Sequence, residues 1–389
     1  MYAALFARPG ARALALACAA GYLAYAGITL ALVLLVQDAT GSFAVAGLVV
    51  GGFAVGAGAL APVRGRLVDR RGAPALLWLG AVYTVALAAL VALPGHGPAG
   101  LTVALATVAG ALSPPLIATA RAVWPRVAGP DLTRAAHATN ALLGDLAAVL
   151  SPALVGVLAA TAGPAIALAA IGLGPLLGCI LLARVGGPRA NERRVDGRMN
   201  IGGAMGFPGV RTIVWAGVPL GIALGGLEVG APAFALEQGH PALVAAPLAS
   251  FAAGSVIASF WAGHSRRAGG PATRFVAGAA VLAAALAPAP FAGSIGSLAA
   301  VLVVAGAGFA LLNVGCLELL DIVVPGRNAV EALTWLTSAE ALGLAAGAAV
   351  AGALAGHGSS AALAVAAIAP AAAAAVALAR RGTLGRAGP

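Results

Sequence analysis

The chain has 389 residues, of which 61% are hydrophobic and only 9% are charged, and its mean hydropathy is +1.01. Soluble globular proteins carry about 25% charged residues, so this composition excludes a soluble enzyme. It also excludes a disordered chain, because such chains are polar and highly charged. The formal net charge is +10, and every basic residue is an arginine.

The positions of the arginines and cysteines exclude further classes. The arginines occur in short runs between long apolar segments and do not form one solvated basic face, so we expect no nucleic-acid partner. The three cysteines lie far apart inside apolar segments, without metal-ligand or disulfide spacing. We therefore expect neither a metal site nor a cofactor.

Apolar runs of about 20 residues, each long enough to cross the hydrocarbon core of a bilayer, recur from one end of the chain to the other. They predict an all-α integral membrane protein with twelve transmembrane helices. The predicted spans are 13–36, 43–63, 74–93, 100–121, 137–160, 164–184, 211–236, 242–263, 274–290, 297–320, 329–355 and 359–379.

Arginine positions support this division, because the cytoplasmic loops of membrane proteins are rich in basic residues. With the N-terminus taken as cytoplasmic, all 22 basic residues fall at the two termini and in the loops on the same side. The opposite loops hold Asp38, His96, Glu237, His240 and His357 instead. We predict a multi-pass protein of the cell membrane with both termini in the cytoplasm.

The longest polar stretch, Gly186 to Pro208, separates the first six spans from the last six. It predicts an N-terminal half at 1–185, a cytoplasmic linker at 186–208 and a C-terminal half at 209–389. The junctions after spans two and eight form a weak repeat, since each has a glycine, an arginine pair and a second glycine. Two related six-helix halves with a binding site between them are a recurrent transporter plan.

The predicted loop between spans two and three carries a motif. Residues 65–72 read GRLVDRRG. This segment resembles the G-x-L-x-D-R-x-G loop of the major facilitator superfamily and occupies the same position, although Ala73 and Pro74 replace the family's further basic pair. With the span count and the mid-chain linker, the resemblance covers the whole chain and implies the major facilitator fold, with two six-helix halves.

The resemblance also implies a gate on the cytoplasmic side. In the family the loop aspartate faces the N-terminus of span eleven, where the positive end of the helix dipole attracts a carboxylate. Here that aspartate is Asp69, and Arg66 or Arg70 is expected to reach a glutamate at the start of span eleven. The alternative is an arginine cluster that only sets orientation. The predicted gate residues are Gly65, Arg66, Asp69, Arg70, Gly72 and Glu331.

Spans two and eleven are rich in glycine, and in the family these spans meet across the interface between the halves. Their small-xxx-small spacing lets helix backbones approach closely, and it predicts direct packing of the two spans. The stripe that we expect to face span two includes Gly343 and Gly347, and Glu340 aligns with it. The glycines are Gly47, Gly51, Gly52 and Gly56 in span two and Gly343, Gly347, Gly352 and Gly356 in span eleven.

The branch within the family is indicated by span five. Residues 150–156 read LSPALVG and resemble a worn G-P-x-x-G-G element of exporters, from which Ser151 and Val155 depart. The family's arginine in the outer part of span four is absent, because Arg121 falls at the cytoplasmic end of that span. The resemblance is greatest to the proton-coupled drug-efflux branch, and an importer or metabolite carrier on the same fold stays open.

Carboxyl groups inside the spans are the candidate proton-binding and substrate-binding sites. A carboxylate at the bilayer centre costs about 2.5–3.5 kcal/mol on insertion scales, so it is expected to face a cavity or a partner. The candidates are Asp145 in span five, Glu228 in span seven and Glu340 in span eleven. Because burial disfavours the charged form of a carboxyl group, a proton and a cationic substrate would compete for it.

Further residues complete the predicted site. The glycines and prolines between Gly217 and Pro232 predict that span seven bends or opens. Glu318 and Asp321 are expected to cap the inner end of span ten near Arg327. The residues expected to line the cavity are Tyr22, Tyr25, Asn140, Asn313 and Trp335.

These features predict a secondary active transporter that exports small lipophilic, cationic compounds by proton-coupled alternating access. No nucleotide-binding loop of the G-x-x-x-x-G-K type occurs, so we expect an ion gradient to supply the energy. The expected partners are a small-molecule substrate, protons and the lipid bilayer, and we expect a monomer that is not an enzyme. The rival from another class is a non-transporting membrane receptor or scaffold.

Overall fold

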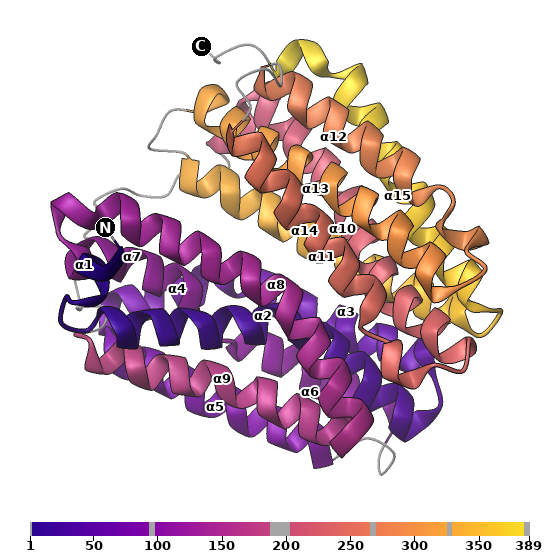
Figure 1. Ribbon diagram of the computed structural model, residues 1–389, viewed down its shortest axis with the longest axis horizontal. Helices are drawn as coiled ribbons and strands as arrows, with labels where there is room; N and C mark the ends of the chain where they lie inside the picture. Colours follow the sequence, from indigo (N-terminus) through magenta and orange to yellow (C-terminus); the bar gives the residue numbers. More distant parts are fainter. Residues whose placement is uncertain (1, 93–97, 187–202, 265–269, 325–328, 385–389) are drawn as a thin grey trace.

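The computed structural model describes residues 2–92, 98–186, 203–264, 270–324 and 329–384, and within these ranges the regular structure is helical (Figure 1). The helices of the first part are α1 (Tyr2–Phe6), α2 (Ala11–Thr40), α3 (Phe43–Ala59), α4 (Ala61–Arg71), α5 (Ala73–Ala92), α6 (Ala99–Leu112), α7 (Leu116–Ala128), α8 (Thr133–Ala162) and α9 (Pro164–Arg184). Those of the second part are α10 (Pro208–Glu237), α11 (Ala246–His264), α12 (Pro271–Leu286), α13 (Ile295–Val323), α14 (Ala329–Ala355) and α15 (Ser359–Ala379).

The predicted spans are confirmed. Eleven segments of the described chain are long and apolar enough to cross a membrane, and the bent pair α3–α4, with an angle of 48°, makes twelve if it counts as one span. Figure 1 shows α2 to α9 gathered in one half and α10 to α15 in the other. The predicted linker coincides mostly with residues 187–202, which lie outside the described residues, so its limits stay a prediction.

Helices α3 and α14 form the largest contact between the halves. A Cβ atom on Gly47 would lie 2.1 Å from the carbonyl oxygen of Ala348, and one on Gly352 would lie 2.4 Å from that of Phe43. Glycine is therefore needed on both helices at this crossing, as predicted. Gly51 faces Ala345 in the same way.

Several other glycines of these two spans serve neighbours within their own halves, which corrects the predicted stripe on span eleven. Gly343 and Gly347 approach the carbonyls of Val218 and Ile222 on α10, not α3. Glu340 lies on this α10 side, because a Cβ atom on Gly217 would come within 3.6 Å of its Cγ atom. Gly and Ala are so frequent in α14 that several of its faces carry only small side chains. Small-residue spacing alone therefore does not predict which face packs against α3 and which against α10.

We expect Gly47→Val to destabilise the protein, because the added atoms would push α3 away from the α14 backbone. Overpacking of this kind costs about 1–3 kcal/mol. The measurement is the thermal unfolding midpoint of the purified protein in detergent. Gly100→Val is the matched control, since a Cβ atom on Gly100 of α6 would meet no atom within 4 Å. Equal shifts for the two variants would contradict the expectation.

Span seven is one unbroken helix, contrary to the predicted opening, and the predicted bend stays a prediction. Helix α10 runs through Pro219 and Pro232 without interruption. Its glycines are used for packing: Gly217, Gly221 and Gly225 lie against α14, while Gly226 and Gly230 lie against α15. Close support from two helices on both sides explains why the helix persists despite its composition.

The motif between spans two and three is also helical, although the sequence suggested a loop. Helix α4 continues through the motif and ends at Gly72, whose φ of 68° lies in the left-handed region that favours glycine. By contrast, a Cβ atom on Gly65 would meet open space. The backbone conformation therefore favours glycine at position 72, whereas neither backbone conformation nor packing requires glycine at position 65.

Arg64, just before the motif, is buried where two helices break. Its Nη2 atom donates to the carbonyl oxygen of Ala57 at 2.7 Å near the end of α3, and its Nη1 atom donates to the carbonyl oxygen of Gly110 near the end of α6. In an uninterrupted helix the Gly110 carbonyl would accept from the N–H of residue 114, but Pro114 has none. The backbone N–H of Ser113 donates to this carbonyl at 3.1 Å instead, and the guanidinium group adds a second donor that ties α4 to both helix ends.

Candidate functional site

Glu228 of α10 lies at the interface between the two halves. The hydroxyl group of Thr29 on α2, in the opposite half, lies close to its carboxyl group. The Oε2 atom is buried and has no hydrogen-bond partner among the described residues. A carboxyl group with an unpartnered oxygen at an interface between moving parts is suited to bind a proton or a cation there.

Tyr25 and Glu340 lie in the same region of the interface as Glu228. Tyr25 lies one helical turn from Thr29 on α2, and Glu340 and Glu228 are both close enough to act electrostatically on its hydroxyl group. The side chain of Glu340 lies beside Gly217, eleven residues before Glu228 on α10, so the two carboxyl groups approach Tyr25 from different levels of that helix. The side chain of Tyr25 is 76% exposed and projects into open space between the halves.

A second polar group lies within the N-terminal half. The hydroxyl oxygen of Tyr22 on α2 accepts hydrogen bonds from Asn140 of α8 at 2.9 Å and from Arg121 of α7 at 3.3 Å. The Oδ1 atom of Asn140 is buried without a partner among the described residues. This network joins three helices.

Arg121 is a residue that the sequence analysis placed only at the end of a span. Span four continues seven residues beyond it, to Ala128, so Arg121 lies within the helix, where its side chain reaches Tyr22. The signal in the sequence was the Pro114–Pro115 break, because a broken span needs more residues to cross the membrane. The hydropathy profile alone ends the span too early.

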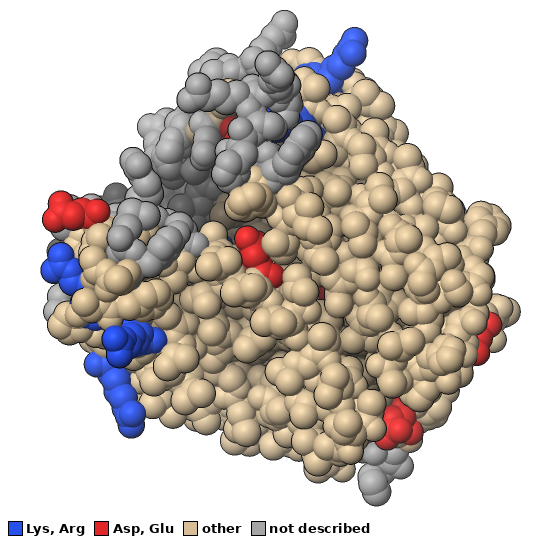
Figure 2. All heavy atoms as spheres, in the orientation of Figure 1, with Lys and Arg blue, Asp and Glu red and all other residues tan. Residues whose placement is uncertain are grey.

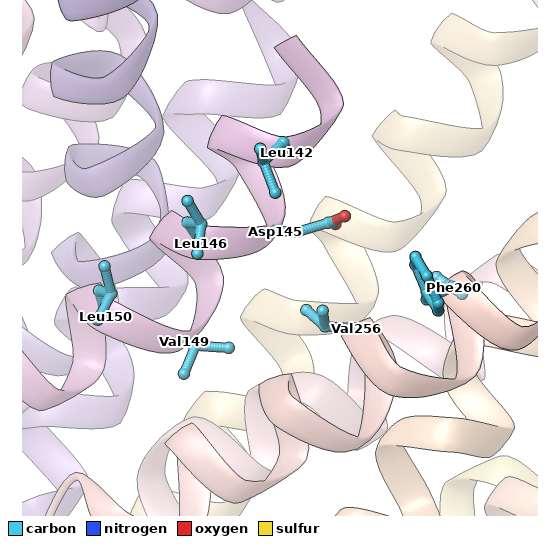
Figure 3. Close-up of a pocket in the computed structure, with 8 residues that line it drawn as sticks. Leu142, Asp145, Leu146, Val149, Leu150, Val256 and Phe260 are labelled. Carbon is cyan, nitrogen blue, oxygen red and sulfur yellow. The ribbon is translucent and has the colours of Figure 1, made fainter. Parts of the chain in front are cut away.

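Asp145 lines a separate cavity of about 320 Å³ between α8 and α11. Figure 3 shows its carboxyl group pointing away from α8, with Val256 and Phe260 of α11 on the opposite side of the gap. Nearer the other end of α8 the gap closes, since a Cβ atom on Gly156 would lie 2.7 Å from the Cβ atom of Ala245. The halves therefore meet at one end of this helix pair and separate at the other.

The end at which the halves separate is the arginine-bearing end. On the face drawn in Figure 2, the basic side chains lie along the edge that contains α7 and the chain termini in Figure 1, and the remaining surface is mainly uncharged. Phe260 and Asp145 lie in the parts of α11 and α8 that are nearest to this edge. The opening thus faces the side that the arginines mark.

Comparisons with known proteins agree with this architecture. Residues 14–348 match the family described as Major Facilitator Superfamily. The chain belongs to the major facilitator superfamily. This match covers most of both halves, and it makes the protein a transporter by family, not an enzyme. No curated protein matches the chain in sequence.

Solved structures of other major facilitator proteins share the fold at low identity. An auto inhibited POT family peptide transporter is 13% identical, covers 96% of each chain and has a TM-score of 0.72. The nucleoside transporter NupG is 13% identical over 95% of this chain and 98% of its own, with a TM-score of 0.70. A bacterial homologue of the human lysosomal transporter Spinster, in an inward-facing and occupied conformation, is 14% identical over 96% and 94%, with a TM-score of 0.63.

The predicted gate of this major facilitator protein is in place only in part. The carboxylate of Glu331 accepts hydrogen bonds from the backbone N–H of Ala204, at 3.2 Å, and from the indole of Trp335, at 3.4 Å. Asp69 and Arg70 are exposed on α4. Glu331 thus holds the segment that leads into α10, and the latch with Arg66 or Arg70 stays a prediction for a closed state.

The remaining predicted residues lie elsewhere. Glu318 of α13 forms an ion pair with Arg274 of α12 at 2.8 Å, so it joins two helices of one half, and the predicted cap near Arg327 stays a prediction. The side chains of Asp321 and Arg327 lie outside the described residues. Asn313 is exposed on α13, and its role in the cavity stays a prediction.

Proposed function

We propose that this major facilitator protein is a secondary active transporter that exports small lipophilic cations in exchange for protons. The observation that carries the proposal is the placement of Glu228 and Glu340, together called the carboxyl cluster, within electrostatic range of Tyr25 of the other half, with Thr29 close to Glu228. When the halves move relative to each other, the surroundings of these carboxyl groups must change. A site of this kind binds different ligands in the two conformations.

The chemistry follows from the cost of burying charge. An unpaired carboxylate in a membrane interior is unfavourable, so the group is expected to take up a proton or pair with a cation. A lipophilic cation and a proton cannot both neutralise the same carboxyl group. Their competition couples the outward movement of one to the inward movement of the other.

The orientation in the proposal rests on the arginines. Cytoplasmic ends of membrane helices are enriched in basic residues, so the arginine-bearing end is assigned to the cytoplasm, with both termini and the predicted gate on that side. The separation of α8 and α11 at this end then corresponds to a cavity that is open toward the cytoplasm. We propose that the protein works in the cell membrane as a monomer of two halves, at 1–185 and 209–389.

A polar-metabolite carrier is the second candidate function. It is favoured by the network of Tyr22, Asn140 and Arg121, because a guanidinium group beside an unpartnered amide oxygen suits a polar or anionic substrate. Among the structural neighbours are proteins named as a peptide transporter and a nucleoside transporter.

Transport by purified protein in proteoliposomes with an imposed pH gradient separates the two candidates. We expect tetraphenylphosphonium to move against the proton gradient, and an ionophore that collapses the gradient to abolish this movement. Gradient-driven movement of dipeptides or nucleosides, with none of the lipophilic cation, would replace the proposal by the carrier. No flux of any of these compounds would favour the receptor or scaffold reading instead.

A further inference from the structure

The cavity between α8 and α11 differs from the carboxyl cluster in its walls. It is lined by Leu142, Leu146, Val149 and Leu150 of α8 and by Val256, Ser259 and Phe260 of α11, and its one ionisable residue is Asp145. An apolar cavity with a single carboxyl group selects for a ligand with one positive charge on an apolar body.

Its position determines from where such a ligand arrives. Leu142, Leu146 and Leu150 recur every four residues, so they form one stripe along α8, and their exposed fractions are 54%, 47% and 55%. They belong to the apolar segment Thr139–Ala162, which is long enough to span the bilayer. Exposed leucines within a membrane-spanning segment are suited to contact hydrocarbon. The stripe therefore gives the cavity an apolar side that suits the lipid.

Depth along the helix places the cavity in one leaflet. Asp145 is the thirteenth residue of α8, counted from Thr133 at the arginine-bearing end, and the α8–α11 gap is closed further along at Gly156. At a rise of about 1.5 Å per residue, Asp145 lies roughly 18 Å along a 45 Å helix. The lateral opening thus faces the leaflet on the arginine-bearing side.

We propose that this cavity is a lateral access site, where a single-chain amphiphilic cation enters from the adjoining lipid leaflet with its charged head at Asp145. The leucine stripe contacts the hydrocarbon chain. Phe260, on the same cavity wall, is 71% exposed and adds apolar surface. The proposal rests on the proposed function only in that the captured cation is then the transported substrate.

Two measurements on the full-length protein in lipid nanodiscs test the site. In the first, Phe260→Trp supplies a fluorophore, and phosphatidylcholine brominated on its acyl chains is the quencher. We expect stronger quenching of Phe260→Trp than of the parent protein, because lipid reaches the cavity. Equal fractional quenching of the two proteins would overturn lateral access.

The second measurement is equilibrium binding of dodecyltrimethylammonium, followed through the same tryptophan. We expect Asp145→Asn to weaken binding about fivefold or more, as loss of one close charge pair near a surface allows, and Asp38→Asn, at an exposed carboxylate, to leave it unchanged. Val256→Trp, which fills the cavity, is expected to weaken binding as well. Equal affinity in the Asp145→Asn and Asp38→Asn proteins would overturn the site.

These readouts need no proton gradient, so they fail or succeed independently of coupling. Asp145-dependent binding without proton-driven flux would leave the access site standing and overturn the proposed coupling. The opposite result is proton-driven flux that persists in the Asp145→Asn protein, with equal affinities in the Asp145→Asn and Asp38→Asn proteins. It would overturn the access site and leave the proposed coupling standing.

Discussion

Proton-driven transport by the Glu228→Gln protein is expected to fall about tenfold or more, in the range of typical coupling free energies between two sites. The substitution keeps the size of the side chain and an oxygen acceptor near Thr29, but it removes the group that exchanges a proton. Glutamine places an amide group, which cannot ionise, where the buried carboxyl group of Glu228 lies. The measurement is uptake into proteoliposomes under an imposed pH gradient, normalised to the amount of inserted protein.

Two further measurements make this expectation specific. Exchange of labelled for unlabelled substrate without a gradient is expected to persist, because binding and rocking of the halves do not require net proton movement. Asp38→Asn, at an exposed carboxylate near the end of α2, is the matched control and is expected to transport normally. Full gradient-driven flux in both Glu228→Gln and Glu340→Gln would show that the cluster does not carry the coupling.

Arg64→Met is expected to lower the stability of the protein by about 1.5–3 kcal/mol, the range for hydrogen bonds that involve a charged group. The side chain is buried and donates to the carbonyl oxygens of Ala57 and Gly110, which lie at two helix breaks. Methionine keeps the apolar length of arginine but leaves both carbonyls without this donor. The measurement is the thermal unfolding midpoint in detergent, with Arg71→Met, on the exposed end of α4, as the control.

A double-mutant cycle tests the physical reason. If Arg64 stands in for the N–H that Pro114 lacks, then replacing Pro114 and Pro115 by alanine lets α6 and α7 join and returns a backbone donor to Gly110. In that background Arg64→Met is expected to cost less, since interacting sites are not additive. The same cost in both backgrounds would mean that Arg64 stabilises the protein by another route.

Hydropathy alone was sufficient to identify the spans, although it ended span four too early. Most apolar runs recur as a helix within a few residues, because the length of a transmembrane helix is set mainly by the thickness of the bilayer. The arginines were equally informative, since charged side chains stay outside the hydrocarbon whatever the packing. The glycine at position 72 could also be understood locally, because its positive φ is a property of a single residue.

The partners of each residue depended on packing. Gly343 and Gly347 meet α10 although their spacing suited α3 equally well, and α10 continues through two prolines because α14 and α15 support it. The sequence placed Arg121 at the end of a span and Arg64 in a loop, yet both side chains reach neighbouring helices. Glu318 found Arg274 on a neighbouring helix.

The sequence by itself therefore determined the number and approximate length of the spans, because these follow from transfer of each segment between water and lipid. Only the tertiary structure decided that Glu228 meets Thr29 and that Asp145 faces α11. In a chain this rich in alanine and glycine, most faces of a helix carry small side chains and can pack closely against a neighbour. Which of them meet is settled by the joint packing of all twelve spans, and no local pattern records that result.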